Sequence, residues 1–101
     1  MNERYNEALK AVETQKPPAL NIYEDMCETL LRLTDAELSH VVRAALEYYT
    51  NGVMPENLDR AEYLTFEGLR NGIDRSFETY RERQRQRTLA AIKRWEAQND
   101  N

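Results

Sequence analysis

The chain has 101 residues, of which 41% are hydrophobic and 32% are charged, and its net charge is −4. This length supports one hydrophobic core and excludes two, and only three glycines and three prolines argue against an all-β fold. A single cysteine excludes an intramolecular disulfide framework and fits a reducing compartment. No segment approaches the roughly 20 apolar residues of a membrane-spanning helix, so we expect a cytoplasmic protein.

The first third of the chain predicts two short amphipathic helices. Residues 3–15 place apolar side chains at helical spacing, and Lys16-Pro17-Pro18 cannot continue that helix. Asn21 followed by Glu24 matches the cap pattern of a second helix of about three turns.

Thr34-Asp35-Ala36-Glu37 is the clearest local signal in the sequence. A threonine cap with a glutamate three residues later predicts the start of a third helix. Asn51-Gly52 predicts its end, because glycine readily takes the left-handed conformation that closes a helix.

Residues 59–98 predict one long C-terminal helix, because no proline interrupts about forty residues of helix-compatible chemistry. Asp59 and Glu62 match a cap at its start. Gly68 and Gly72 weaken this helix, so it either bends or breaks near Gly72 or lets another helix approach closely. We therefore expect an all-α fold, a small bundle of three shorter helices packed on a long, straight or bent C-terminal helix.

The apolar stripe of the long helix ends at Tyr80. We expect Ile73 and Phe77 at the centre of the core, facing the third helix. Residues 1–80 are therefore predicted as a helical core domain, and residues 81–101 as a basic helical extension.

Charge is unevenly distributed along the chain. Residues 1–80 carry a net charge of −7, whereas residues 81–101 carry +3. The basic side chains of the extension are candidates for binding nucleic acid or a partner protein: Arg81, Arg83, Arg85, Arg87, Lys93 and Arg94. Arginines two positions apart are splayed around a helix, which favours a helix in a negatively charged groove over a flat patch. A solvated helix whose arginines pair with glutamates explains the same residues.

Aromatic and arginine side chains on the predicted helices form a candidate ligand pocket: Tyr48, Tyr49, Tyr63, Tyr80, Arg43, Arg70 and Arg75. Aromatic rings can stack on a base while arginines bind its phosphates, so a cyclic nucleotide is the candidate ligand. Aromatic side chains at helical spacing are also typical of a core, and that alternative stays open.

Leu89, Ile92 and Trp95 form a second short apolar stripe beyond the charged segment. An unbroken helix of forty residues is about 60 Å long, which is more than a core of this size can cover. We therefore expect these three residues to form the contact of a homodimer.

We expect no enzymatic activity, no metal and no cofactor. His40 is the only histidine and lies opposite the apolar stripe of the third helix, so we expect it to be exposed and inert. Cys27 is predicted to be buried or half-buried and not a nucleophile. A glycine-rich phosphate loop, a serine nucleophile elbow and a metalloprotease helix motif are absent from the sequence.

Several pieces of the sequence resemble, in order and spacing, a family of short helical proteins carried by phages and prophages of Gram-positive bacteria. These pieces are Ile22-Tyr23, Leu33–Glu37, Ala44–Gly52, Phe66, and Ile73-Asp74-Arg75 with Tyr80. The resemblance covers residues 20–85, and the function of that family is not established. After Tyr80 the chain departs from it, because the family has a basic tail rich in alanine and glycine there. The resemblance implies a phage protein in a bacterial host cell that acts by binding.

The leading hypothesis is a non-enzymatic phage-type accessory protein that binds nucleic acid or a replication protein as a helical dimer through residues 81–95. The alternative is an anti-defence inhibitor that blocks a host nuclease or sequesters a cyclic nucleotide signal. The expected partners are therefore a second copy, nucleic acid, a host or phage protein or a cyclic nucleotide, and not a membrane.

Overall fold

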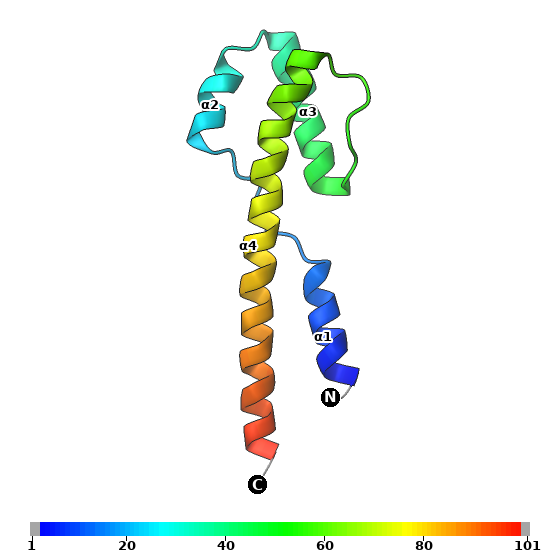
Figure 1. The fold of residues 1–101 in the computed structure, drawn as a ribbon, viewed down its shortest axis with the longest axis vertical. Coiled ribbons are helices and arrows are strands. Elements are labelled where there is room, and N and C mark those ends of the chain that lie inside the picture. The colour runs from blue at the N-terminus through cyan, green and yellow to red at the C-terminus, as the bar shows by residue number, and fades with distance from the viewer. Residues whose placement is uncertain (1–2, 100–101) are drawn as a thin grey trace. The chain divides into compact units, whose positions relative to one another are not determined.

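The computed structural model describes residues 3–99, which form four helices (Figure 1). In chain order these are α1 (Glu3–Glu13), α2 (Glu24–Leu31), α3 (Asp35–Asn51) and α4 (Arg60–Asn99). No strand occurs within these 97 residues. The predicted all-α fold, with three shorter helices packed on a long C-terminal helix, is confirmed.

The described chain divides into two compact units that share α4. The first unit combines residues 3–18 with residues 76–99, and the second contains residues 19–75. The predicted division after residue 80 differs from this one, because α1 lies in one unit with the basic segment and α2 and α3 lie in the other. Residues 100 and 101 of the predicted extension lie outside the described residues.

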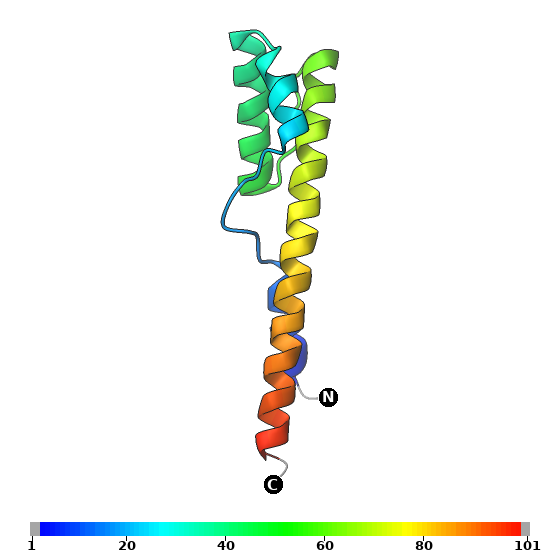
Figure 2. The same ribbon diagram turned by 90° about the vertical axis from the view of Figure 1, so that its left-hand side faces the viewer.

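In the second unit, α3 runs parallel to α4 and α2 runs antiparallel to it (Figures 1 and 2). Two glycines of α4 allow α2 to approach closely. A Cβ atom on Gly68 would lie 2.8 Å from Met26 Sδ, and one on Gly72 would lie 3.1 Å from the ring of Tyr23. Helix α4 is continuous past both glycines. Of the two predicted outcomes at Gly72, close approach of a helix is therefore the one observed.

The core of the second unit lies where α3 meets the N-terminal part of α4. Val41 and Phe66 are fully buried, and Ile73 is 3% exposed. The prediction for Ile73 is therefore confirmed. The prediction for Phe77 is wrong, because this side chain is only half-buried and belongs to the first unit, which does not contain α3.

Local sequence signals define both ends of α3. Thr34 Oγ1 accepts a hydrogen bond from the Glu37 backbone N–H at 3.2 Å, and the Thr34 backbone N–H donates to Glu37 Oε1 at 2.9 Å. Gly52 closes the helix with a φ of 70°, in the left-handed region that favours glycine. The predicted cap and the predicted end of this helix are both confirmed.

The predicted start of α2 is wrong. The helix begins at Glu24, and its cap residue is Tyr23, whose side chain makes no capping hydrogen bond. Asn21 therefore lies in the connection before the helix, although the chain offers an asparagine in a favourable sequence context.

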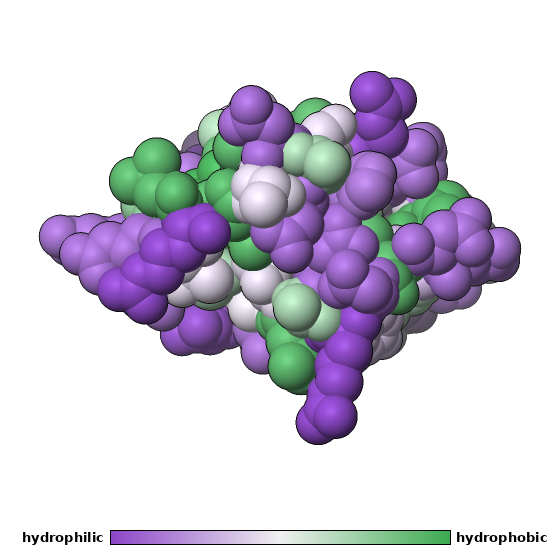
Figure 3. Space-filling model, turned by 90° about the horizontal axis from the view of Figure 1, so that it is seen from above, coloured by the Kyte–Doolittle hydropathy of each residue, from purple (hydrophilic) through white to green (hydrophobic). Residues whose placement is uncertain are grey.

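Hydrophobic side chains also reach the surface. Seen from the end of the molecule where α4 begins, hydrophobic residues form separate patches among hydrophilic ones (Figure 3). Leu31 and Leu64 of the second unit are 83% and 61% exposed. Across residues 3–99, no helix combines the length and the apolar character needed to cross a bilayer.

Candidate functional site

The basic segment of α4 has one face covered by α1 and one face open to solvent. In the first unit α1 lies antiparallel to this segment (Figure 1). The half-buried positions on this part of α4 include a set at steps of three and four residues, which is the period of one helix face: Phe77, Arg81, Gln84, Thr88 and Ile92. Val12 of α1 is 2% exposed. The arginines of α4 from Arg81 onward therefore divide into those near α1 and those away from it.

Arg81 and Arg85 lie on the covered side and bind groups of the chain itself. Arg81 Nε donates a hydrogen bond of 2.7 Å to the Gln15 carbonyl oxygen just beyond the end of α1. Its guanidinium carbon lies 5.2 Å from the centre of the Phe77 ring, in cation–π geometry. Arg85 forms an ion pair with Glu82. Arg81 thus connects α4 to the chain just after α1, whereas Arg85 pairs within α4.

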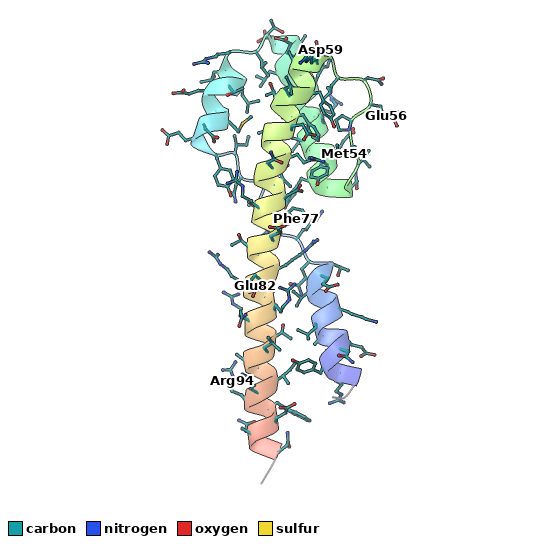
Figure 4. All side chains as sticks on the ribbon, viewed as in Figure 1. Met54, Glu56, Asp59, Phe77, Glu82 and Arg94 are labelled. Atoms are coloured by element: carbon teal, nitrogen blue, oxygen red, sulfur yellow. The ribbon has the colours of Figure 1, made fainter. Side chains whose placement is uncertain are left out.

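Arg83, Arg87 and Arg94 lie on the other side, and we call these three residues the basic stripe. Steps of four and seven residues return a helix to within about 40° of its starting direction, so the three side chains share one face. All three are exposed, and Figure 4 shows Arg94 on the side of α4 away from α1. None of them forms an ion pair with any side chain that the structure describes. Lys93 is also exposed beside the stripe.

As predicted, arginines two positions apart, such as Arg81 and Arg83, point in different directions around the helix. Arg83, Arg87 and Arg94 nevertheless align, because steps of four, seven and eleven residues return to nearly the same direction around a helix. The sequence could not show which arginines α1 would cover, because no sequence signal indicates that α1 packs against this part of α4.

The structure brings three of the seven residues of the predicted ligand pocket together. Tyr48, Tyr63 and Arg70 lie near each other in the second unit, where both tyrosine rings are 6.0 Å from the ring of Phe66. Tyr49 is half-buried, whereas Arg43 and Arg75 are exposed. Tyr80 is half-buried in the first unit.

Carboxylates of the second unit already occupy the polar groups of this aromatic cluster. Tyr48 Oη donates a hydrogen bond of 2.5 Å to Asp74 Oδ1. Arg70 Nη2 lies 2.9 Å from Glu67 Oε2, and Arg70 Nη1 contacts Met54 Sδ at 3.9 Å. A nucleotide phosphate bound here would therefore have to displace two carboxylates of the chain.

The hydrogen bond to Asp74 raises the pKa of Tyr48 above its ordinary value of 10.0, because the carboxylate stabilises the neutral phenol and burial adds to the effect. Because the pKa of Tyr48 is higher in the folded state than in the unfolded state, its hydrogen bond contributes stability that is fully present below pH 10.0. This stability is lost as pH rises through the raised folded-state pKa. We expect the wild type to lose more unfolding free energy than Tyr48→Phe in this alkaline range, as measured by urea denaturation. Asp74→Asn should likewise lose less unfolding free energy than the wild type in this pH range. Parallel curves for all three proteins would contradict this coupling.

A contact between His40 and Glu62 connects α3 to the start of α4. His40 Nδ1 lies 2.6 Å from Glu62 Oε2, and Glu62 is 4% exposed. Glu62 Oε1 accepts from the Asp59 backbone N–H at 3.1 Å, and Asp59 Oδ1 accepts from the Glu62 N–H at 2.8 Å. The predicted cap at Asp59 is therefore confirmed. His40 is exposed as predicted, but it is a structural partner of a buried carboxylate and not inert.

A groove in the first unit lies between the N-terminal end of α1 and the C-terminal end of α4. Its volume is about 400 Å³. Helix α1 contributes Arg4, Tyr5 and Ala8, and α4 contributes Ala91, Ile92, Trp95 and Glu96. The floor is therefore apolar, with one cationic and one anionic side chain among the lining residues.

The three residues of the predicted dimer contact differ in exposure. Leu89 and Ile92 are half-buried, while Trp95 is 50% exposed. Ile92 thus already lies beside α1. Helix α1 was predicted to belong to the core domain of residues 1–80.

Other chemistry is sparse in the described residues. Within residues 3–99, no group of three or more His, Cys, Asp or Glu side chains is placed to hold a metal ion. Cys27 is an exposed thiol, so the prediction that it is buried or half-buried is wrong.

Comparison with known proteins places the chain in a family. Residues 20–98 match the model of DUF6291, a family of unknown function, and the chain belongs to this family. Neither a curated protein nor a solved structure matches the chain.

Proposed function

We propose that this member of a family of unknown function binds the phosphate backbone of nucleic acid through the basic stripe and catalyses no reaction. The observation that carries the proposal is the alignment of Arg83, Arg87 and Arg94 on the exposed face of α4. Arginine is suited to phosphate because its planar guanidinium donates several hydrogen bonds and stays charged at any physiological pH.

The distribution of charge supports binding by the first unit alone. Counted over its two sequence segments, residues 1–18 and 76–101, the first unit has nine basic and seven acidic side chains. The second unit has five basic and eleven acidic side chains, a net charge of −6 that repels phosphate. The three arginines lie within twelve residues and extend over about 16 Å of helix, enough to follow several phosphates of one strand.

Binding of this kind reads the backbone and not the bases. Contacts with phosphate are sequence-independent and release counterions, so affinity falls as salt rises. If each of the three arginines neutralises one phosphate, affinity should fall about 40-fold between 50 and 200 mM salt.

The test compares two triple variants with the same net charge. Arg83→Gln/Arg87→Gln/Arg94→Gln removes the stripe, and it should abolish most binding and reduce the slope of log affinity against log salt by about 3. The matched control removes three exposed arginines of the second unit: Arg32→Gln, Arg43→Gln and Arg60→Gln. Fluorescence anisotropy with labelled single- and double-stranded DNA and RNA measures both quantities.

The control variant should bind as the wild type does. No wild-type affinity for any of these nucleic acids at low salt, or equal affinity of the two triple variants, would overturn the proposal.

We extend the proposal to a phage protein acting in the cytoplasm of a bacterial host, which the resemblance of residues 20–85 supports. The contacts of Tyr48 and Arg70 with carboxylates do not favour the alternative of a cyclic nucleotide site. A role in blocking a host nuclease rests on the net charge of the second unit and stays a prediction.

A further inference from the structure

The groove of the first unit leaves a large aromatic side chain without full cover. Trp95 is 50% exposed, more than any other large hydrophobic side chain described in this unit. It lies with Tyr5 and Ile92 along a cavity of about 400 Å³. Tryptophan buries a large area when it enters an interface, and it is enriched among residues that dominate binding energy.

The charges that line the groove are of opposite sign. Arg4 comes from α1 and Glu96 comes from α4. Neither forms an ion pair with a side chain that the structure describes. A partner segment of one charge would be attracted by one of these residues and repelled by the other. A partner that presents both charges in the opposite order satisfies both.

We propose that this partner is a second copy of the chain, which packs groove against groove about a two-fold axis parallel to α1 and α4. Such an axis keeps the height of each residue along the helices and places α1 of one copy against α4 of the other. Arg4 of each copy then faces Glu96 of the other, and this contact occurs twice. The two Trp95 side chains enter the shared apolar centre of a four-helix arrangement.

The dimer leaves the basic stripe accessible. Trp95 and Ile92 line the groove beside α1, whereas Arg83, Arg87 and Arg94 are exposed and lie about 80–120° from Trp95 around the helix. None of the three stripe residues lines the groove, so the dimer is tested without nucleic acid.

The experiment exploits the double contact. Arg4→Glu alone puts two anionic side chains opposite each other at both contacts, and Glu96→Arg alone puts two cationic ones there. Each single variant should therefore be monomeric at micromolar concentrations at which the wild type is dimeric. An equimolar mixture of the two variants restores opposite charges at both contacts, so it should form a dimer with one copy of each. Sedimentation velocity and native mass spectrometry measure mass and composition.

Arg32→Glu is the control, because it reverses an exposed charge in the second unit and should leave the dimer intact. Circular dichroism on every variant shows whether loss of the dimer occurs with the helices preserved. A wild-type monomer, single variants that remain dimeric, or a mixture of folded variants that stays monomeric would each overturn the proposal.

Discussion

Replacing Phe66 with alanine should lower the free energy of unfolding by about 3–5 kcal/mol. Phe66 is fully buried, and the Tyr48 ring meets it edge-on at 6.0 Å with an interplanar angle of 86°. The variant loses the transfer energy of the ring and leaves a cavity between α3 and α4. A protein of this size has about 5–15 kcal/mol of stability in total, so the loss is a large share of it. Urea denaturation monitored by circular dichroism measures the change.

Leu64→Ala is the matched control for this prediction. Leu64 lies two positions earlier on the same helix and is 61% exposed. Its removal should change the free energy of unfolding by no more than about 0.5 kcal/mol. Similar losses in the two variants would show that Phe66 is not at the centre of a packed core.

Replacing His40 with alanine should lower the free energy of unfolding by about 1–3 kcal/mol. The reason is the buried partner and not the histidine itself, whose side chain is 59% exposed. Without the imidazole, Glu62 Oε2 loses its 2.6 Å contact in a residue that is only 4% exposed. A buried acceptor without a partner loses its hydration and gains nothing in return.

Ser39→Ala provides the reference for this experiment, since Ser39 is exposed at the neighbouring position of α3. Chemical denaturation of the two variants should separate them clearly. If His40→Ala is as stable as Ser39→Ala, the contact with Glu62 does not contribute to stability.

Local signals in the sequence predicted helix ends well. The caps at Thr34 and Asp59 and the left-handed Gly52 depend only on residues a few positions apart, and the structure contains all three. At Asn21 the same local logic failed, because Tyr23 packs against Gly72 and α2 begins one residue after it. Tertiary packing thus overrode a favourable cap.

Contacts between distant residues could not be predicted in the same way. The contact between His40 and Glu62 depends on the register between α3 and α4. The hydrophobic period predicts which face of each helix is buried, but not this register. The packing of α1 against residues 76–99 of α4 could not be predicted for the same reason. The pattern of an amphipathic helix shows which of its faces is buried, but not which helix covers that face. The candidate arginines could therefore be named from the sequence, whereas their division into covered and exposed sets required the structure.

The first unit consists of two segments separated by the 57 residues from Ala19 to Arg75. Its closing contact joins Gln15 to Arg81, whereas the contacts of Tyr48 and His40 with α4 join residues only 26 and 22 positions apart. Bringing chain ends together costs more entropy as the intervening loop lengthens, and a folded second unit shortens that loop. We therefore expect the second unit to form first from near neighbours and α1 to dock afterwards. We expect substitutions that loosen α3 to weaken the attachment of α1 as well, because an unfolded second unit leaves the full loop to be closed.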